Sequence, residues 1–273
     1  MGRPAATTLA IPTMNVAVAS AGDGTPVIYL HDMLLDHVAD GGDLPQALIP
    51  LSESFSVRIP SLPGFRDLGQ LEQMSTVVDY VLWVGDVIKG LEVVQPHVIG
   101  TGLGGWIAAE YAVHHSSDLR TLTLVNAFGL KVEDHPTARF FVAAAPNPLG
   151  GRREVRELLF ADPSSQVANS AMPDFLDDDA NVRFFNSMHA AARIGWKPPT
   201  FYDPDLLGRL WRISVPTHVI WGAQNALVDV AHAEAFSRGI AGSTLTLLEG
   251  AAHAVVLEQP DELGQALTKF LLQ

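Results

Sequence analysis

The sequence predicts an α/β protein with a mostly parallel sheet, helices on both faces and a helical cap. Short runs rich in β-branched residues alternate with helical stretches along most of the 273 residues. From Val27 onward, most of these runs are hydrophobic nearly throughout, which is typical of strands covered on both faces. Such alternation implies parallel strands joined by right-handed crossovers.

The individual elements follow from this pattern. The expected strands lie at 15–19, 27–30, 55–59, 97–99, 122–125, 218–221 and 245–248. The expected helices lie at about 43–53, 76–92, 104–115, 229–238 and 259–272.

A long interval from about Lys131 to Asp205 carries several short helical patterns and no convincing strand. A structureless loop of that length is improbable in a compact domain, so we predict a helical cap at 131–205. The core then comprises residues 1–130 and 206–273. Aromatic side chains of the cap could line an apolar pocket, although each could instead pack the cap against the core. These aromatic residues are Phe140, Phe141, Phe160, Phe175, Phe184, Phe185 and Trp196.

Composition argues against several classes of partner and site. Lys and Arg total 17 against 30 Asp and Glu, a formal net charge of −13, whereas nucleic acids and anionic membranes attract a basic face. The absence of cysteine excludes disulfides, thiolate catalysis and Cys-ligated zinc. We find no apolar core of a secretory signal and no run near the roughly 20 residues that span a bilayer. We therefore expect a soluble cytoplasmic protein; its oligomeric state cannot be read from the sequence.

Loops at the ends of predicted strands hold the residues whose side chains could bind a ligand or take part in a reaction. His31-Asp32-Met33 follows one strand, and a glycine-rich turn at 100–105 joins another strand to a helix. Two further strands are followed by 222–225 and 249–253. Ligands of open parallel sheets bind at the carboxyl ends of strands, so these loops can converge on one site.

In order and spacing, these loops resemble the α/β-hydrolase superfamily, specifically its cap-bearing bacterial members of the meta-cleavage-product-hydrolase kind. The resemblance runs over roughly residues 25–272 and is thinnest in the cap. In that family, a G-x-S-x-G turn carries the nucleophile, an acid follows a later strand, and a histidine follows the last. The resemblance places these three positions at Gly102, Asn225 and His253.

The same resemblance implies an oxyanion hole formed by the backbone N–H groups of Met33 and Leu103. Asp32 stands where the family usually has glycine. His31, Thr101 and Trp106 are expected to line the substrate pocket, together with Phe140, Phe141 and Trp196 of the cap.

The substitutions remove the covalent mechanism of this family. Gly102 has no atom that could attack a carbonyl, and Thr101 should point in a different direction from its neighbour in a tight turn. Loss of the nucleophile costs a triad enzyme about 10⁶ in turnover. Glycine suits the strained backbone of the turn, and the missing side chain should leave space for water or a substrate group. Asn225 carries no charge to stabilise an imidazolium, so a neutral His253 is expected.

We therefore expect a non-covalent enzyme that acts on a small apolar substrate containing a carbonyl group. His253, helped by Asp32, would transfer a proton or position water, without a cofactor. Elimination, cyclisation, carbon–carbon lyase chemistry and direct water attack all fit this description. One alternative is a pseudohydrolase that binds a ligand or partner. Another is a hydrolase inactivated by mutation, although three departures from the pattern fit natural divergence better.

Two further types of site are weaker alternatives. Residues 100–105 also match G-x-G-x-x-G, the dinucleotide-binding fingerprint, after a strand and before a helix. However, Asn126 stands where that fingerprint needs an acid, and three strands precede this one instead of none.

A metal site is not expected. His114 and His115 are neighbours on a helix and face different directions. His31, Asp32, Asp36 and His37 form a denser group, but the resemblance gives the strand-end histidine a loop-bracing role.

Overall fold

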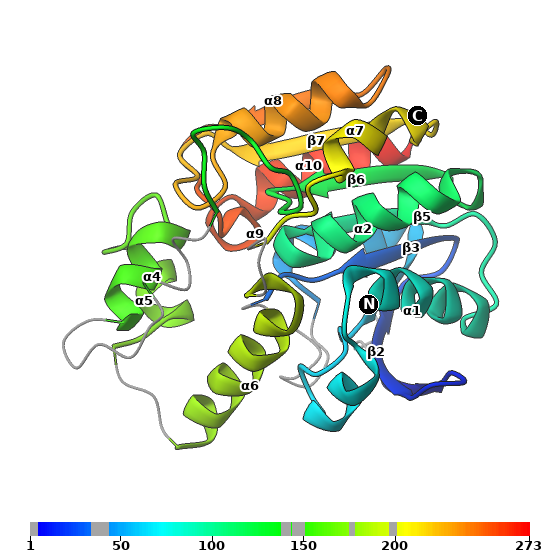
Figure 1. Cartoon of the computed structure of the whole chain (residues 1–273), viewed down its shortest axis with the longest axis horizontal. Helices are drawn as coiled ribbons and strands as arrows, with labels where there is room; N and C mark the ends of the chain where they lie inside the picture. The colour runs from blue at the N-terminus through cyan, green and yellow to red at the C-terminus, as the bar shows by residue number, and fades with distance from the viewer. Residues whose placement is uncertain (1–4, 34–43, 138–142, 144–150, 175–177, 197–200) are drawn as a thin grey trace.

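The chain forms a single eight-stranded sheet in the computed structural model, which describes residues 5–33, 44–137, 143, 151–174, 178–196 and 201–273. The strand order is β1-β2-β4-β3-β5-β6-β7-β8 (Figure 1). The strands are β1 (Ala5–Ala10), β2 (Asn15–Ala21), β3 (Thr25–Leu30), β4 (Phe55–Pro60), β5 (His97–Thr101), β6 (Thr121–Val125), β7 (Thr217–Gly222) and β8 (Thr244–Leu248). From β4 through β8 along this order all pairs are parallel, whereas β2 pairs antiparallel with both β1 and β4. The predicted mostly parallel sheet is confirmed.

Four of the five helices predicted for the core are confirmed, as α1 (Val77–Gly90), α2 (Gly102–His115), α8 (Val230–Gly239) and α10 (Pro260–Leu271). Two short helices, α7 (Leu206–Arg209) and α9 (Val255–Glu258), were not predicted. The helix predicted at 43–53 is wrong, because Gln46–Leu48 and Pro50–Glu53 form two short 3₁₀ turns. Pro50 has no N–H that could donate to the preceding turn, so the first turn ends before it and a second 3₁₀ turn begins at Pro50.

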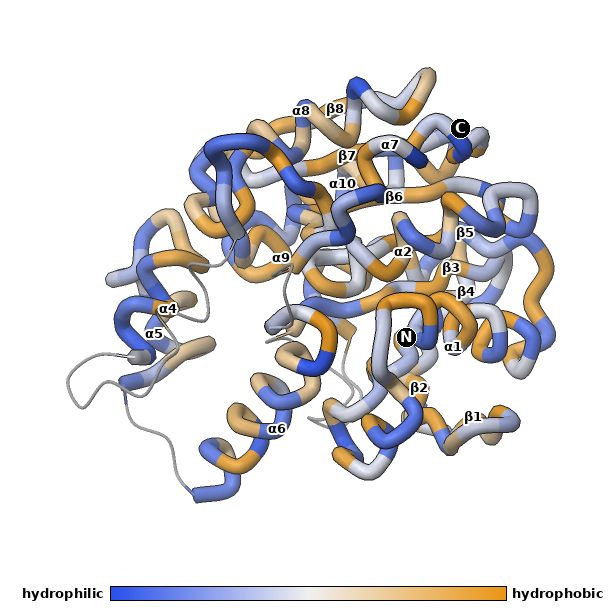
Figure 2. Tube along the Cα trace, in the orientation of Figure 1, coloured by the Kyte–Doolittle hydropathy of each residue, from blue (hydrophilic) through white to orange (hydrophobic). Residues whose placement is uncertain are grey.

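Helices cover both faces of the sheet, as the hydrophobic strands predicted. Ile28 of β3 belongs to a core cluster with Ile107 of α2 and Phe236 of α8. The adjacent Val27 faces the opposite side and belongs to a second cluster with Leu263 of α10. In Figure 2 the central strands are accordingly coloured as hydrophobic. The edge strand β8 differs, since three of its five residues are exposed.

Residues between β6 and α7 form the helices expected of the cap. They are α4 (Gly151–Leu159), α5 (Gln166–Ala171) and α6 (Asp178–Gly195), which lie to one side of the sheet in Figure 1. Within the described part of 131–205 no strand occurs; Tyr202 makes only an isolated bridge with Gly129. The division into a core and a cap with these boundaries stays a prediction. None of the helices in the described ranges has both the length and the apolar character needed to cross a bilayer.

Glu110 is a buried carboxyl group on α2, and its side chain accepts a hydrogen bond of 3.0 Å from Trp106 Nε1. Burial is the main cause that raises the pKa of Glu110 to about 7, and the nearby Asp203 adds to it, while Trp106 and Arg209 act in the opposite direction. The native state therefore binds a proton that the unfolded chain releases near pH 4.5.

We expect the free energy of unfolding to fall as the pH rises from about 4.5 to 7, by on the order of 2 kcal/mol for this group. Glu110→Gln mimics the protonated acid, keeps the acceptor for Trp106 and should remove this component. Urea unfolding at pH 5 and pH 7.5 measures it, with the exposed Glu72→Gln as the control. An unchanged pH dependence in the Glu110 variant would contradict the assignment.

Candidate active site

The turn between β5 and α2 forms the base of the candidate site. Gly102 begins α2 with φ +49°, the left-handed backbone that the sequence led us to expect at this position. Two residues later, a Cβ on Gly104 would lie 2.2 Å from the carbonyl oxygen of Leu30 in β3. Glycine at position 104 therefore lets α2 begin directly against the neighbouring strand, beside the loop that carries Asp32.

The Asp32 carboxylate occupies the space beside Gly102. A Cβ built on Gly102 would lie 1.9 Å from Asp32 Oδ1 and 2.1 Å from its Cγ. The expectation that the missing side chain leaves room for water or a substrate group is therefore wrong. The carboxylate takes up the volume that a side chain at position 102 would fill.

Asp32 is held by three donors. Its Oδ1 accepts the backbone N–H of Leu103 at 2.9 Å, its Oδ2 lies 3.0 Å from His253 Nε2, and the N–H of Met33 also bonds the carboxylate. Burial alone would raise the pKa of Asp32, but His253 and the two N–H groups outweigh it and hold the pKa below its usual value. The predicted oxyanion-hole donors, Met33 and Leu103, are therefore bonded to the protein's own carboxylate.

Asn225 lies on the other side of His253, and its amide has a defined orientation. Its Oδ1 accepts the backbone N–H groups of Leu227 and Val228 at 3.1 and 3.0 Å. Its Nδ2 consequently faces His253 Nδ1 at 3.1 Å. The structure thus brings Asp32, His253 and Asn225 into one buried chain of hydrogen bonds, in which the side chain of His253 is 1% exposed and that of Asp32 is 8% exposed.

An amide and a carboxylate, neither of them predicted, hold the loop of His253. Asn126 has a positive φ of +47°, donates from Nδ2 to the carbonyl oxygens of Ala252 and His253 at 2.9 Å, and accepts from Gly222 N. Glu258 accepts the N–H groups of Ala252 and of Ala161, which follows α4. The polar Asn126 directly after a buried strand was the available signal for the first of these.

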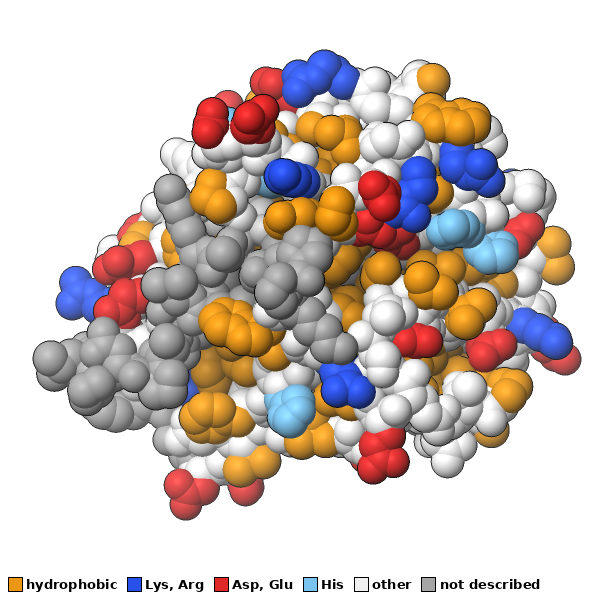
Figure 3. Space-filling model, viewed as in Figure 1, with side chains coloured by type: hydrophobic (Ala, Val, Ile, Leu, Met, Phe, Trp, Pro, Cys, Tyr) orange, Lys and Arg blue, Asp and Glu red, His pale blue; other side chains and the backbone are white. Residues whose placement is uncertain are grey.

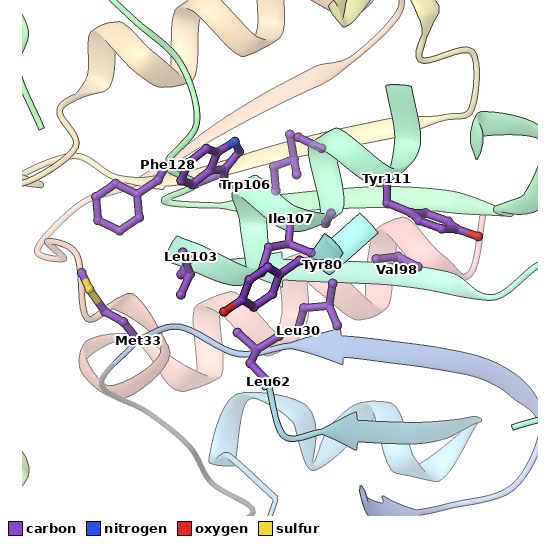
Figure 4. Packing of buried hydrophobic residues seen from close by; sticks show 14 of the residues in the cluster. Leu30, Met33, Leu62, Tyr80, Val98, Leu103, Trp106, Ile107, Tyr111 and Phe128 are labelled. Carbon is purple, nitrogen blue, oxygen red and sulfur yellow. The ribbon is translucent and has the colours of Figure 1, made fainter. Parts of the chain in front are cut away.

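Three of the predicted pocket residues have other roles. Both ring nitrogens of His31 bond backbone groups, Nδ1 to Asp32 O at 2.7 Å and Nε2 to Leu62 N at 2.9 Å, so this histidine braces the loop. The hydroxyl of Thr101 bonds Tyr29 at 3.1 Å, because alternate residues of a strand face opposite sides, and does not reach His253. Trp106 is buried beside Phe128 in the core (Figure 4). The assignment of these three residues to the substrate pocket stays a prediction.

The aromatic residues of the cap give a mixed result. Phe140 and Phe141 lie outside the described residues. Trp196 ends up 54% exposed at the end of α6, so it is not enclosed in a pocket by the described part of the chain. Phe128, which was not predicted, contacts His253 with ring centroids 5.3 Å apart and stacks on Phe201 at 4.4 Å. Figure 3 shows further hydrophobic side chains at the surface around the residues drawn in grey.

The geometry also bears on the two weaker alternatives. A dinucleotide would place its pyrophosphate against the N–H groups that begin α2, but the Leu103 N–H already bonds Asp32. Asn126, at the position that needs an acid, is used to hold backbone groups. Among the described residues, no group of three His, Asp or Glu side chains is arranged to hold a metal ion; Asp36 and His37 lie outside them.

Comparison with known proteins establishes the family. Residues 27–266 match the profile of the Alpha/beta hydrolase family. The chain belongs to this family. Monoacylglycerol lipase ABHD6 of Bos taurus is 29% identical over 192 residues, which cover 64% of this chain and 54% of that protein. The chain thus spans about half the length of such curated relatives. The AB hydrolase superfamily protein YisY of Bacillus subtilis is 25% identical and is covered over 95% of its length, with 94% of this chain.

Solved structures share the fold over nearly the whole chain. The 2-hydroxy-6-oxo-6-phenylhexa-2,4-dienoate hydrolase from Rhodococcus sp. strain RHA1 superposes with a TM-score of 0.75 at 17% identity, covering 99% of this chain and 100% of that one. The meta-cleavage product hydrolase CumD, in the form of a point mutant, gives 0.78 at 17% identity, with 97% of each chain covered. These likenesses confirm the predicted α/β-hydrolase fold.

Proposed function

We propose that this member of the family is an enzyme that transfers protons without a covalent intermediate. Its substrate is a small, mostly apolar molecule that contains a carbonyl group. One observation carries the proposal: the buried Asp32 carboxylate fills the place of a side chain at Gly102 and lies 3.0 Å from His253 Nε2. An ionisable pair of this kind is what general acid–base catalysis requires, and it replaces the attacking hydroxyl that position 102 lacks.

The surroundings of the pair keep a proton acceptor available at neutral pH. The lowered pKa of Asp32 keeps it ionised, and its side chain is the more exposed of the two. Removal of a proton next to a carbonyl group would move negative charge from Asp32 to the substrate, close to the same N–H donors and to the start of α2. Elimination, cyclisation, carbon–carbon lyase chemistry and attack by an activated water all begin with such a transfer.

The names of the relatives suggest hydrolysis, but that activity carries over only with a change of mechanism. Monoacylglycerol lipase and meta-cleavage product hydrolase are the activities named for two of them. At the turn before α2, this chain has a glycine and a carboxylate from another loop. Any hydrolysis here would therefore proceed by direct attack of water, with Asp32 and His253 as the groups that move its proton.

The second candidate function is a pseudohydrolase that binds a ligand or partner without turning it over. The occupied oxyanion-hole donors favour it, because Met33 and Leu103 already bond Asp32 and cannot stabilise a substrate oxyanion in this state. The two candidates differ in whether the Asp32–His253 pair moves protons.

The ring opening of 5-nitrobenzisoxazole tests the proposal, because it needs only a base and an apolar site and is followed by absorbance. We expect the wild-type protein to exceed an equal concentration of acetate by more than about 10²-fold, within the range of general base catalysis. Asp32→Ala should remove most of this acceleration, whereas the exposed Asp23→Ala should retain it. A serine-directed phosphonate should leave no adduct. A wild-type rate equal to that of acetate would favour the pseudohydrolase.

A further inference from the structure

The orientation of the Asn225 amide determines which nitrogen of His253 carries the proton. Two backbone N–H groups, from Leu227 and Val228, donate to Asn225 Oδ1, so the amide cannot turn over without setting N–H against N–H. Its Nδ2 therefore donates to His253 Nδ1 across 3.1 Å. A nitrogen that accepts a hydrogen bond carries no proton, so in the neutral ring the proton is on Nε2.

The other side of the ring agrees with this assignment. Nε2 lies 3.0 Å from Asp32 Oδ2, which is an acceptor when ionised. The N–H of Leu103 holds the second oxygen, Oδ1, at 2.9 Å. Every contact along this chain thus has one donor and one acceptor, and the order is Asn225 to His253 to Asp32. In a Ser-His-Asp triad the direction is opposite, because the acid accepts from Nδ1–H and leaves Nε2 free to act as the base.

From this polarity we propose that Asp32 is the proton acceptor of the site, that His253 is a hydrogen-bond donor to it, and that Asn225 is a positioning residue that sets the tautomer. This rests on the proposed function and assigns its roles differently from the histidine base of the family's triads. His253 cannot take a proton on Nε2 while that nitrogen already has one. It can take one on Nδ1 only by losing the bond from Asn225.

The assignment also defines the class of substrate. In the step, an oxygen of Asp32 forms an O–H bond, the C–H or O–H bond of the substrate breaks, and its electron pair stays on the substrate as an enolate or alkoxide. The substrate is therefore a neutral carbon or oxygen acid. A substrate that carries a carboxylate would be repelled by the charge of Asp32. The Asp32 carboxylate already occupies the beginning of α2, where a helix N-terminus could otherwise bind an anion.

Nuclear magnetic resonance of the ¹⁵N-histidine-labelled protein tests the tautomer directly, with His253 assigned by the signal that His253→Gln removes. We expect a protonated Nε2 and an unprotonated Nδ1 at pH 7. The reverse tautomer, or a ring protonated on both nitrogens, overturns the inference whether or not the protein turns over any substrate. The measurement on the wild-type chain needs no folded variant at this site.

Asn225→Asp gives the second test. A carboxylate there still accepts from Leu227 and Val228 but draws a proton onto His253 Nδ1, which places an imidazolium beside Asp32 and makes Asp32 a weaker base. We expect the ¹⁵N signal to show a proton on Nδ1 and the rate with 5-nitrobenzisoxazole at pH 7 to fall at least about tenfold. A rate that stays the same or rises overturns the role of Asp32, because the introduced carboxylate would then be supporting a histidine base. Asn15→Asp on the exposed start of β2 adds the same charge and should leave both readouts unchanged.

Discussion

Asp32→Asn is expected to reduce proton abstraction from 5-nitrobenzisoxazole by about 10²–10⁴-fold, the usual contribution of a positioned base. The amide has the shape of the carboxylate but cannot accept the proton. It also places an NH₂ group against either His253 Nε2–H or the N–H of Leu103, both of which are donors. Because Asn225 holds the His253 tautomer from the other side, this conflict cannot be relieved by moving the ring proton. We therefore also expect a loss of about 1–3 kcal/mol in the free energy of unfolding at pH 7.

The pH dependence of stability provides the control for this variant. The pKa of Asp32 is lowered in the native state, so its contribution to stability is present above its unfolded pKa near 3.8 and is lost as the pH falls toward and below it. Urea unfolding between pH 7 and pH 3 should show a smaller decrease for Asp32→Asn than for the wild type. The exposed Asp23→Asn should behave as the wild type in stability and rate. If Asp32→Asn retained the wild-type rate, Asp32 would not be the base.

Most of the fold could be predicted from the sequence because each buried parallel strand has a hydrophobic run of its own that can be recognised locally. The hydrophobic run at 97–101 and its glycine turn need no knowledge of the rest of the chain to be recognised. β1 could not be recognised in this way, since Ala5–Ala10 has no alternating hydrophobic pattern and is a strand only because it pairs with β2. The two 3₁₀ turns around Pro50 were likewise missed, because the hydrophobic spacing at 43–53 favours a helix and the proline that interrupts it was not given enough weight.

The candidate site was predicted as a set of positions but not as a set of contacts. Strand ends and glycine turns indicated the loops, and the family resemblance indicated the positions Gly102, Asn225 and His253. These three converge with Asp32. That the Asp32 carboxylate bonds Leu103, 71 positions away, depends on how two loops meet across β3 and β5. A local sequence pattern cannot predict a contact between residues so far apart in the chain. For this reason we expected an empty space beside Gly102 where a charged side chain lies.

Gly102→Ala should be strongly destabilising in the wild-type chain and much less so when Asp32 is shortened. The added Cβ would lie 1.9 Å from Asp32 Oδ1, on a residue with φ +49°. Overpacking typically costs about 1–3 kcal/mol and the left-handed backbone adds about 1 kcal/mol, so we expect a loss of about 2–4 kcal/mol. In an Asp32→Gly background only the backbone cost should remain. A double-mutant cycle by urea unfolding measures the difference, and a coupling below about 0.5 kcal/mol would contradict the packing described here.

The same contact decides what is needed to restore a covalent hydrolase. Gly102→Ser with Asn225→Asp supplies the missing nucleophile and acid, but it leaves the Asp32 carboxylate in the space of the new side chain and on the N–H of Leu103. We expect this double variant to be silent on a short nitrophenyl ester and to unfold at lower urea than the wild type.

Adding Asp32→Gly should change both results. It frees the N–H groups of Met33 and Leu103 for an oxyanion, removes the clash with the serine, and returns His253 Nε2 to the nucleophile. The triple variant should cleave the ester with an initial burst and take up a serine-directed phosphonate. Asp32→Gly alone, which has no nucleophile, should do neither. Ester cleavage by the double variant at the level of the triple one would mean that Asp32 does not occupy the place of the nucleophile, and the roles assigned to it here would fail together.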